Sequence, residues 1–194
     1  MSSDASIAGY HISIDGYLIQ LLPTLSDANV RGLAELLIDC VAGGASVSFM
    51  HPLPLAKAVD FWRGVAAAVA EGKRALLVAR DATGIAGTVQ LILEQPENQP
   101  HRADLAKMLV HRRARRRGLG AALLRAAEHL AERRGKSLLV LDTASGDAER
   151  LYAKLGWQRC GVIPGYALWP QGGLCDTTYF YRTLPAGDAP PRHP

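Results

Sequence analysis

Cysteines and long apolar runs are scarce in this sequence. Its 194 residues include three cysteines, and none of them stands in a Cys-x-x-Cys or Cys/His spacing. An odd count with no secretory segment favours reduced thiols, so we expect a cytoplasmic protein. No apolar run approaches the roughly 18 residues that a membrane-spanning helix requires, so we expect no membrane partner.

Metal-binding and nucleic-acid-binding patterns are also missing. The six histidines are scattered, and neither an HExxH motif nor a His/Cys cluster occurs, so the sequence predicts no metal. Aromatic residues make up 6% of the chain, and none is interleaved with the arginines of residues 111–117. Because base stacking is poorly provided for and the net charge is only +4, we expect no nucleic-acid partner. A basic nucleic-acid-binding module stays open as the alternative from another function class.

The length and composition suit one folded unit. With 48% hydrophobic residues, the 194-residue chain can bury one sizeable core. We predict a single domain over residues 10–184, a flexible N-terminus over residues 1–9 and a flexible proline-rich tail over residues 185–194.

Apolar periodicity predicts strands and helices in a mixed order. A first strand is expected over residues 10–22, and Ser26 or Asp27 can cap a helix that ends near Gly43. The remaining expected elements are a helix at 55–70, a hairpin of strands at 74–81 and 85–95, a third antiparallel strand at 103–111, a helix from 119, a strand at 137–143, a helix at 148–155, a strand at 157–162, a loop at 164–176 and a strand at 177–184.

The most informative stretch is Leu105–Arg134, where a strand leads through a basic, glycine-containing turn into a helix. The first N–H groups of a helix have no intrahelical acceptor, and the helix dipole favours an anion there. Gly118 and Gly120 carry no side chain that would keep a ligand from the backbone. Arginines immediately before them favour a phosphate or pyrophosphate. The turn lacks the spacing of a dinucleotide fingerprint or a P-loop.

Two motifs resemble those of the GCN5-related N-acetyltransferases (GNAT). RRRGLG at 115–120 is similar to the turn that holds the pyrophosphate of coenzyme A in that family, and AERLYAKLGWQRCG at 148–161 is similar to its tyrosine segment. The resemblance implies an α/β (α+β) GNAT fold, with a mixed, mostly antiparallel sheet of about seven strands and about four helices. It implies an acetyl-CoA-dependent acyltransferase with direct transfer in a ternary complex. The implied cofactor-binding residues are Met108, Leu109, Val110, Arg115, Arg116, Arg117, Gly118, Leu119, Gly120, Ser145 and Tyr152.

A closer resemblance is to members of this family that acetylate a β-lactam amino acid toxin and so confer antibiotic resistance. It is carried by GGASVSFM at 43–50, HRADLAKMLV at 101–110, LLVLDT at 138–143 and GYALWPQGGLCDTTYFYRTL at 165–184. The resemblance implies Asp104, Asp142 and Tyr152 as catalytic residues. Ser145 lies near the place of an asparagine that is frequent in the family.

Carboxylate and tyrosine side chains suit the proton transfers of an acetyl transfer. A primary amine is mostly protonated at neutral pH, so a carboxylate, either Asp104 or Asp142, can hold the ammonium and take its proton. The tyrosine hydroxyl of Tyr152 can protonate the departing thiolate of coenzyme A. A strand N–H near Leu109 can polarise the thioester carbonyl.

The acceptor is expected to be a small amino-acid-like amine, with polyamines and protein amino groups as alternatives. Loops at 45–51 and 164–176 should line its site, and with Asp104 and Asp142 the site should be net acidic. Phe49, Tyr166 and Trp169 can cover the ligand. A coenzyme A-binding protein without catalysis and a homodimer are both left open by the sequence.

Overall fold

The computed structural model describes residues 11–185. The flexible ends expected at residues 1–9 and 185–194 therefore lie outside the described residues, except for Pro185. The elements in chain order are β1 (His11–Ile14), β2 (Tyr17–Leu22), α1 (Asp27–Ala42), α2 (Leu55–Ala70), β3 (Arg74–Asp81), β4 (Gly84–Ile92), β5 (Arg102–Val110), a 3-10 turn (Arg112–Ala114), α3 (Leu119–Arg133), β6 (Leu138–Thr143), α4 (Gly146–Lys154), β7 (Gln158–Leu168) and β8 (Leu174–Thr183).

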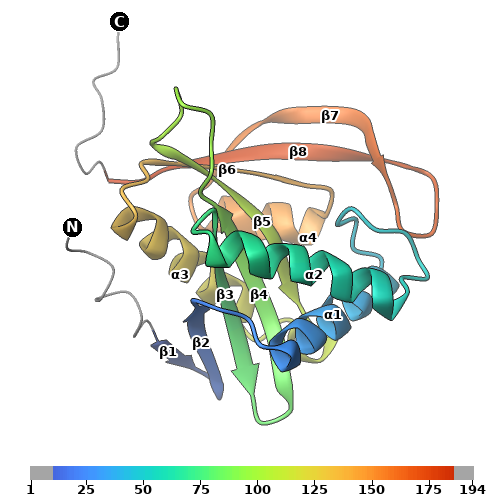
Figure 1. Ribbon diagram of the computed structural model, residues 1–194. Coiled ribbons are helices and arrows are strands. Elements are labelled where there is room, and N and C mark those ends of the chain that lie inside the picture. Colours follow the sequence, from blue (N-terminus) through green and yellow to red (C-terminus); the bar gives the residue numbers. More distant parts are fainter. Residues whose placement is uncertain (1–10, 186–194) are drawn as a thin grey trace, which may run out of the picture.

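One sheet of eight strands runs through the molecule in the order β1-β2-β3-β4-β5-β6-β8-β7. All neighbouring strands are antiparallel except β5 and β6, which are parallel. The expected mixed, mostly antiparallel sheet with flanking helices is confirmed, whereas the count of about seven strands is corrected to eight (Figure 1). The additional strand comes from residues 10–22. Asp15 and Gly16, both with positive φ, turn this segment into the β1–β2 hairpin.

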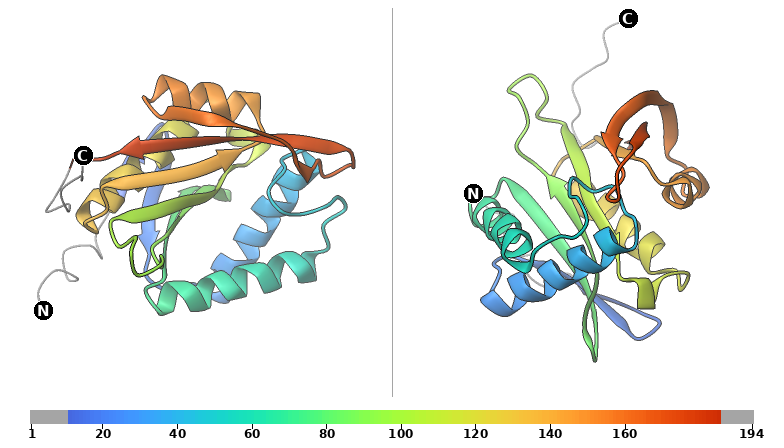
Figure 2. Two further views of the ribbon diagram at one scale, coloured as in Figure 1. Left: turned by 90° about the horizontal axis from the view of Figure 1, so that it is seen from above. Right: turned by 90° about the vertical axis from the view of Figure 1, so that its right-hand side faces the viewer.

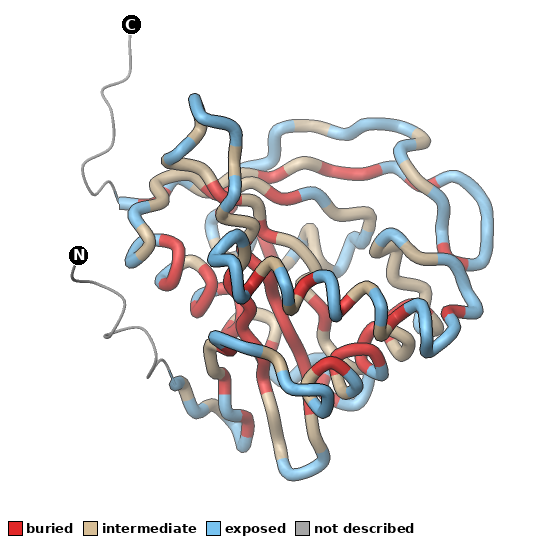
Figure 3. The backbone as a smooth tube through the Cα atoms, in the orientation of Figure 1, coloured by how far each residue is buried: buried red, intermediate tan, exposed pale blue. Residues whose placement is uncertain are grey.

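The helices cover the two faces of the sheet (Figure 2). On one face α1 and α2 enclose a core around Leu33, Leu37 and Trp62. On the other face the apolar positions of α3 pack with Tyr152, Trp157 and Phe180. Figure 3 shows that buried positions concentrate in the strands between the two helix layers.

Local sequence signals account for the helix starts. Ser26 accepts a hydrogen bond from the Asn29 N–H at 3.3 Å and caps α1, as expected. Gly118 precedes α3 in a left-handed conformation with φ of 77°. The apolar side of α3, which includes Leu119, Leu123, Ala127 and Leu130, is buried.

The C-terminal hairpin differs from the expectation. The predicted loop at 164–176 is mostly strand, because β7 extends to Leu168 and β8 begins at Leu174. Register shifts between Arg159 and Gly161 and between Ile163 and Ala167 let the strand pass Pro164 and Gly165. Thus the hairpin projects beside the end of α1 instead of forming an irregular loop (Figure 1).

Candidate active site

The strands β5 and β6 diverge in the middle of the sheet. Their pairing covers only Arg102–Asp104 against Leu138–Val140. Beyond this point β5 continues to Val110 along β4, while β6 continues to Thr143 along β8. We call the gap between the two strands the β5–β6 opening. Its edges carry backbone groups that lie outside the β5–β6 ladder and can bind an extended ligand.

A bulge lies in β5 beside this opening. The β4–β5 register shifts between Thr88 and Gln90, which pair with Leu109 and Ala106. Lys107, inside the bulge, has a φ of 48°. Only a few per cent of non-glycine residues adopt positive φ, and such residues cluster where a site requires them.

We call the turn between β5 and α3, residues 111–120, the anion-binding loop, after the role that the sequence predicts for it. Arg116, with φ of 60°, and Gly118, with φ of 77°, both turn the backbone into the left-handed region. The Ala122 N–H donates to the Gly118 carbonyl at 3.1 Å, at the first turn of α3. The N–H groups that precede Ala122 in this turn have no acceptor within the helix and could donate to a phosphate.

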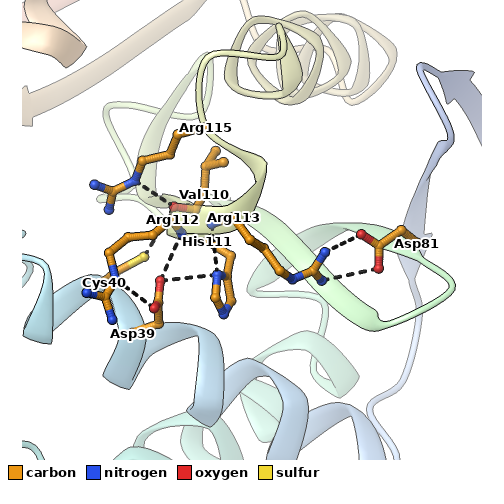
Figure 4. A network of polar contacts seen from close by, with 8 residues as sticks. All are labelled: Asp39, Cys40, Asp81, Val110, His111, Arg112, Arg113 and Arg115. Atoms are coloured by element: carbon orange, nitrogen blue, oxygen red, sulfur yellow. Dashed lines mark hydrogen bonds and ion pairs between the residues drawn. The ribbon is translucent and has the colours of Figure 1, made fainter.

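Ion pairs hold two of the loop's arginines, Arg112 and Arg113 (Figure 4). The Arg112 backbone N–H and its Nε donate to Asp39 of α1 at 2.9 and 2.8 Å. Arg113 pairs with Asp81 at the end of β3. Burial opposes the ionised form of Asp39, but the hydrogen bonds from Arg112 outweigh it and lower the pKa of this carboxyl.

Arg117 is also engaged, although the sequence placed it among the cofactor-binding residues. It pairs with Asp15 at 3.0 Å and donates to the Tyr17 hydroxyl at 2.9 Å. Arg115 donates from Nε to the Val110 carbonyl at 3.1 Å and also interacts with the Cys40 thiol, but it forms no ion pair with any described residue. Arg116 has no ion pair with any described residue. Arg115 and Arg116 are therefore the side chains best placed to contact phosphate oxygens.

The two glycines of the turn have different reasons to be glycine. At Gly118 the reason is the positive φ, since no atom lies within 4 Å of a Cβ built there. At Gly120 a Cβ would lie 3.3 Å from Leu151 Cδ2 and 3.3 Å from Met108 Cε. Gly120 therefore also serves the packing of α3 against α4 and β5, which the sequence argument did not anticipate.

Asp142 lies on β6 where the sheet opens. Its Oδ2 accepts a hydrogen bond from Thr177 Oγ1 at 2.8 Å, and Asp142 is exposed. The backbone of Asp142 is paired with that of Tyr179. Cys175, Thr177 and Tyr179 alternate on one face of β8, the face that meets Ser46 of the α1–α2 loop.

Asp104 is more constrained than Asp142. Arg102 Nη1 donates to its Oδ1 at 2.9 Å and Gln95 Nε2 donates to its Oδ2 at 3.2 Å. Both of its oxygens are thus in use. The two carboxylates still share a neighbourhood, because both contribute to raising the pKa of Tyr179 to about 12, after the larger effects of its Tyr166 hydrogen bond and of burial.

Tyr152 belongs to α4, and its side chain is buried in the core on the opposite face of the sheet. Its ring packs against Trp157 and Phe180 with centroids 5.8 and 5.7 Å away. Burial, with a smaller effect of the Asp142 charge, raises the pKa of Tyr152. A raised pKa keeps the hydroxyl protonated at neutral pH, which is the state required of a proton donor.

The two segments expected to line the acceptor side do lie together. Ser46 Oγ donates to the Leu168 carbonyl at 3.1 Å, and the His51 N–H donates to the Pro170 carbonyl at 2.9 Å. Phe49 packs edge-on against Phe61 of α2 at 5.2 Å. Tyr166 shares a 3.2 Å hydrogen bond with Tyr179, so the expected cover residues are partly held by packing.

Several side chains of this side were missed by the sequence argument. Lys107 Nζ donates to Ser48 Oγ at 3.2 Å and lies 5.6 Å from the Phe61 ring. Thr177 and Tyr179 lie on the same face of the sheet as Lys107. The expectation of a net acidic site stays a prediction, to which the structure adds two basic side chains, Lys107 on this side and Arg102, which pairs with Asp104. No motif marks Lys107, since its position depends on the bulge.

Two further features of the described chain do not fit the expected chemistry. An open depression of about 370 Å³ lies against α4, β7 and β8, but none of the expected catalytic residues lines it. Burial raises the pKa of the Cys40 thiol to about 11, so this cysteine is a poor nucleophile.

Between residues 11 and 185, no group of three His, Cys, Asp or Glu side chains could hold a metal ion. No helix in that range is long and apolar enough to span a bilayer.

Part of the chain is similar to a known protein family. Residues 72–159 match the family described as "Acetyltransferase (GNAT) domain". The matched segment runs from the end of α2 to the start of β7, and it contains the bulge, the anion-binding loop, Asp142 and Tyr152.

Solved structures share the whole fold. A GNAT superfamily phosphinothricin acetyltransferase from Sinorhizobium meliloti, in complex with acetyl-CoA, is 19% identical, with a TM-score of 0.72, covering 90% of this chain and 93% of that one. A ribosomal-protein-alanine N-acetyltransferase from Brucella melitensis is 20% identical, with a TM-score of 0.69 and coverages of 86% and 99%. An N-acetyltransferase from Staphylococcus aureus Mu50 is 14% identical, with a TM-score of 0.70 and coverages of 86% and 99%. The chain has the fold of these acetyltransferases, and its residues 72–159 match a GNAT acetyltransferase domain.

Proposed function

We propose that the chain transfers an acetyl group from acetyl-CoA to the primary amine of a small amino-acid-like acceptor, directly and in a ternary complex. The observation that carries the proposal is the arrangement around the β5–β6 opening. The anion-binding loop lies at the end of β5. Asp142 is exposed on the face of the sheet that carries α1 and α2, and Tyr152 is buried on the opposite face. A thioester held in the opening would have a carboxylate on one side and a phenol on the other.

The loop residues fit the phosphates of acetyl-CoA. Arg115 and Arg116, the glycine turn and the first N–H groups of α3 would hold the pyrophosphate. Met108, Leu109 and Val110 border the opening, and Ser145 precedes α4 beside it. Acetyl-CoA supplies the activated acyl group, and the protein supplies position and proton transfers.

Asp142 is the better candidate for the base. Its carboxylate is exposed and has one hydrogen bond within the described chain, from Thr177. Asp104 has both oxygens bound by Arg102 and Gln95, so it would have to lose an ion pair to accept a proton. We therefore assign the amine proton to Asp142 and the proton of the departing thiol to Tyr152.

The acceptor class rests on two supports. Segments 43–50, 101–110, 138–143 and 165–184 resemble the tabtoxin resistance protein, which acetylates a β-lactam amino acid toxin. One fold relative is named for phosphinothricin, also a small molecule. A role in resistance or self-protection in the cytoplasm follows from this class. A protein amino group is the second candidate, because another fold relative is named for ribosomal-protein alanine.

A panel assay tests the proposal. Release of free thiol from acetyl-CoA would be followed with amino acids, dipeptides, polyamines, aminoglycosides and a peptide with a free N-terminal alanine. We expect turnover with amino-acid-like amines. Turnover on the peptide or an aminoglycoside alone would overturn the acceptor assignment, and binding of acetyl-CoA without turnover on any amine would indicate a non-catalytic protein.

The nucleic-acid alternative is disfavoured by the ion pairs of the loop. Of the five arginines at 112–117, Arg112, Arg113 and Arg117 are engaged with Asp39, Asp81 and Asp15. Few of these charges are left to contact a nucleic-acid backbone.

A further inference from the structure

Lys107 is the one basic side chain that the bulge of β5 places on the acceptor side of the sheet. It contacts Ser48 of the α1–α2 loop and Phe61 of α2, so it lies on the same face as Asp142 and Thr177. An ammonium group has three N–H donors. Within the described chain Lys107 uses one of them, toward Ser48, and it takes part in no ion pair.

The contact between Lys107 and Ser48 joins two residues with unusual backbone. Ser48 has φ of 76° and Lys107 has φ of 48°. The other non-glycine residues with positive φ in the described chain are Asp15, in the β1–β2 turn, and Arg116, in the anion-binding loop. Holding a non-glycine residue there costs on the order of 1 kcal/mol, and such strain is typical of sites that need a particular geometry.

The electrostatic surroundings favour an anion at Lys107. Burial lowers the pKa of Lys107, whereas the Asp142 charge raises it and the Arg74 charge lowers it. Asp104, the other nearby carboxylate, is already paired with Arg102. Lys107 is thus a partly desolvated cation without a bound counterion, and a carboxylate ligand would supply one.

We propose that Lys107 binds the carboxylate of the acceptor while Asp142 receives its amine. The two side chains project from β5 and β6, on either side of the opening, with opposite charges on the same face of the sheet. An α-amino acid carries the matching pair of charges. Lys107 is therefore a specificity residue, which selects zwitterionic acceptors over simple amines. This inference rests on the proposed function.

The experiment compares one amino acid acceptor, the best in the panel, with its carboxamide. The carboxamide keeps the amine and removes the charge that Lys107 is proposed to bind. Because the two amines also differ in intrinsic reactivity, the measured quantity is the change in the ratio of their kcat/KM values between variants. Lys107→Met removes the charge at similar length and Lys107→Arg keeps it. Lys57→Met is the matched control, since Lys57 is exposed on the same face, 6.0 Å from the Phe49 ring.

For Lys107→Met we expect kcat/KM for the amino acid to fall by about 10- to 100-fold, mainly through KM, because a charge-assisted hydrogen bond is lost. The value for the carboxamide should stay within about threefold. Lys107→Arg should recover part of the loss, and Lys57→Met should change neither. Melting temperature and acetyl-CoA affinity, measured on each variant, should match the parent.

Other outcomes distinguish a failure of the Lys107 inference from a failure of the proposed function. Equal losses for both acceptors would show a structural role for Lys107 and overturn the inference, leaving the proposed function in place. Equal kcat/KM values of the parent enzyme for alkylamines and for amino acids would also overturn the inference. This comparison needs no variant. If no primary amine is acetylated, the proposed function and the inference fail together.

Discussion

Asp142 and Asp104 differ in what already occupies their carboxylate oxygens, and this difference predicts different mutant phenotypes. Asp142→Asn should lower turnover by about 100-fold or more, as expected for loss of a general base. Thr177 can still donate to the amide oxygen, so the fold should be preserved. Asp104→Asn should lower turnover less, because Arg102 and Gln95 already occupy both oxygens of Asp104. Parent-like turnover of Asp142→Asn across pH 6 to 9 would transfer the role to Asp104 or to water.

Tyr152 combines packing with chemistry, and Tyr152→Phe separates the two. The substitution keeps the ring between Trp157 and Phe180 and removes only the hydroxyl. We expect kcat to fall by about 10- to 100-fold while acetyl-CoA affinity stays nearly unchanged, because the lost interaction strengthens only as the thiolate develops. Steady-state kinetics and calorimetric titration measure the two quantities. A large loss of affinity with unchanged kcat would contradict the assignment of Tyr152 as the acid.

At the scale of elements, the contact between α1 and the anion-binding loop depends on Asp39. At neutral pH, Asp39→Asn should lower the free energy of unfolding by about 1 to 3 kcal/mol, since it removes an ionised acceptor from Arg112. The folded-state pKa of Asp39 is lowered, so its stabilisation is present above the unfolded pKa near 3.9 and is lost as pH falls through the folded pKa.

Denaturant unfolding at pH 7 and at pH 3 would therefore give a larger difference between parent and variant at pH 7. Glu35→Gln is the matched control on the same helix, because Glu35 forms an exposed pair with Arg31. That pair should contribute less than about 1 kcal/mol. A difference for Asp39→Asn that persisted unchanged at pH 3 would show that the ionised carboxylate is not its cause.

Within the anion-binding loop, two neighbouring arginines should respond in opposite ways. Arg116→Ala should weaken acetyl-CoA binding by about 1 to 2 kcal/mol with little change in melting temperature, since Arg116 has no ion pair in the described chain. Arg117→Ala should lower the melting temperature, since Arg117 joins the loop to Asp15 and Tyr17, and should leave affinity nearly unchanged. Calorimetry and thermal unfolding of both variants test the pair, and the reverse pattern would exchange their roles.

The elements that sequence reasoning predicted well are those with a strong local period. The helices α1, α2 and α3 and the β3–β4 hairpin have regular apolar spacing and end at capping or turn residues. The β1–β2 hairpin was missed although Asp15-Gly16 is a strong turn signal, because apolar residues on both sides were read as one strand. The long β7 was missed because Pro164 and Gly165 argue against a strand, whereas register shifts accommodate them.

The candidate site divides in the same way. The anion-binding loop is contiguous in sequence, so its residues could be predicted from spacing. The acceptor side joins Ser48, Lys107, Asp142 and Thr177, which four separate segments bring together. Lys107 reads as a strand residue between Ala106 and Met108, and only the three-dimensional bulge turns it toward Ser48. Such a contact leaves no local pattern in the sequence.

At the scale of the whole molecule, the ligand is expected to join parts that the sheet holds together weakly. The β5–β6 pairing is confined to three residue pairs, Arg102–Leu138, Ala103–Leu139 and Asp104–Val140. On one side of the opening lie β1 to β5, and on the other β6, β8 and β7. Acetyl-CoA bound to the anion-binding loop and along the opening would contact both parts in the native state only, which stabilises the folded protein.

Binding of acetyl-CoA should therefore raise the melting temperature of the protein. At 100 times its dissociation constant, a ligand specific for the native state contributes about 2.7 kcal/mol, which for a protein of this size raises the melting temperature by roughly 5 to 10 °C. Pantetheine at the same concentration should give a much smaller shift, because it lacks the phosphates that the loop is proposed to bind. Added salt should reduce the acetyl-CoA shift more than the pantetheine shift. Equal shifts from the two ligands would mean that the anion-binding loop contributes little to binding, and the cofactor assignment of Arg115 and Arg116 would have to be abandoned.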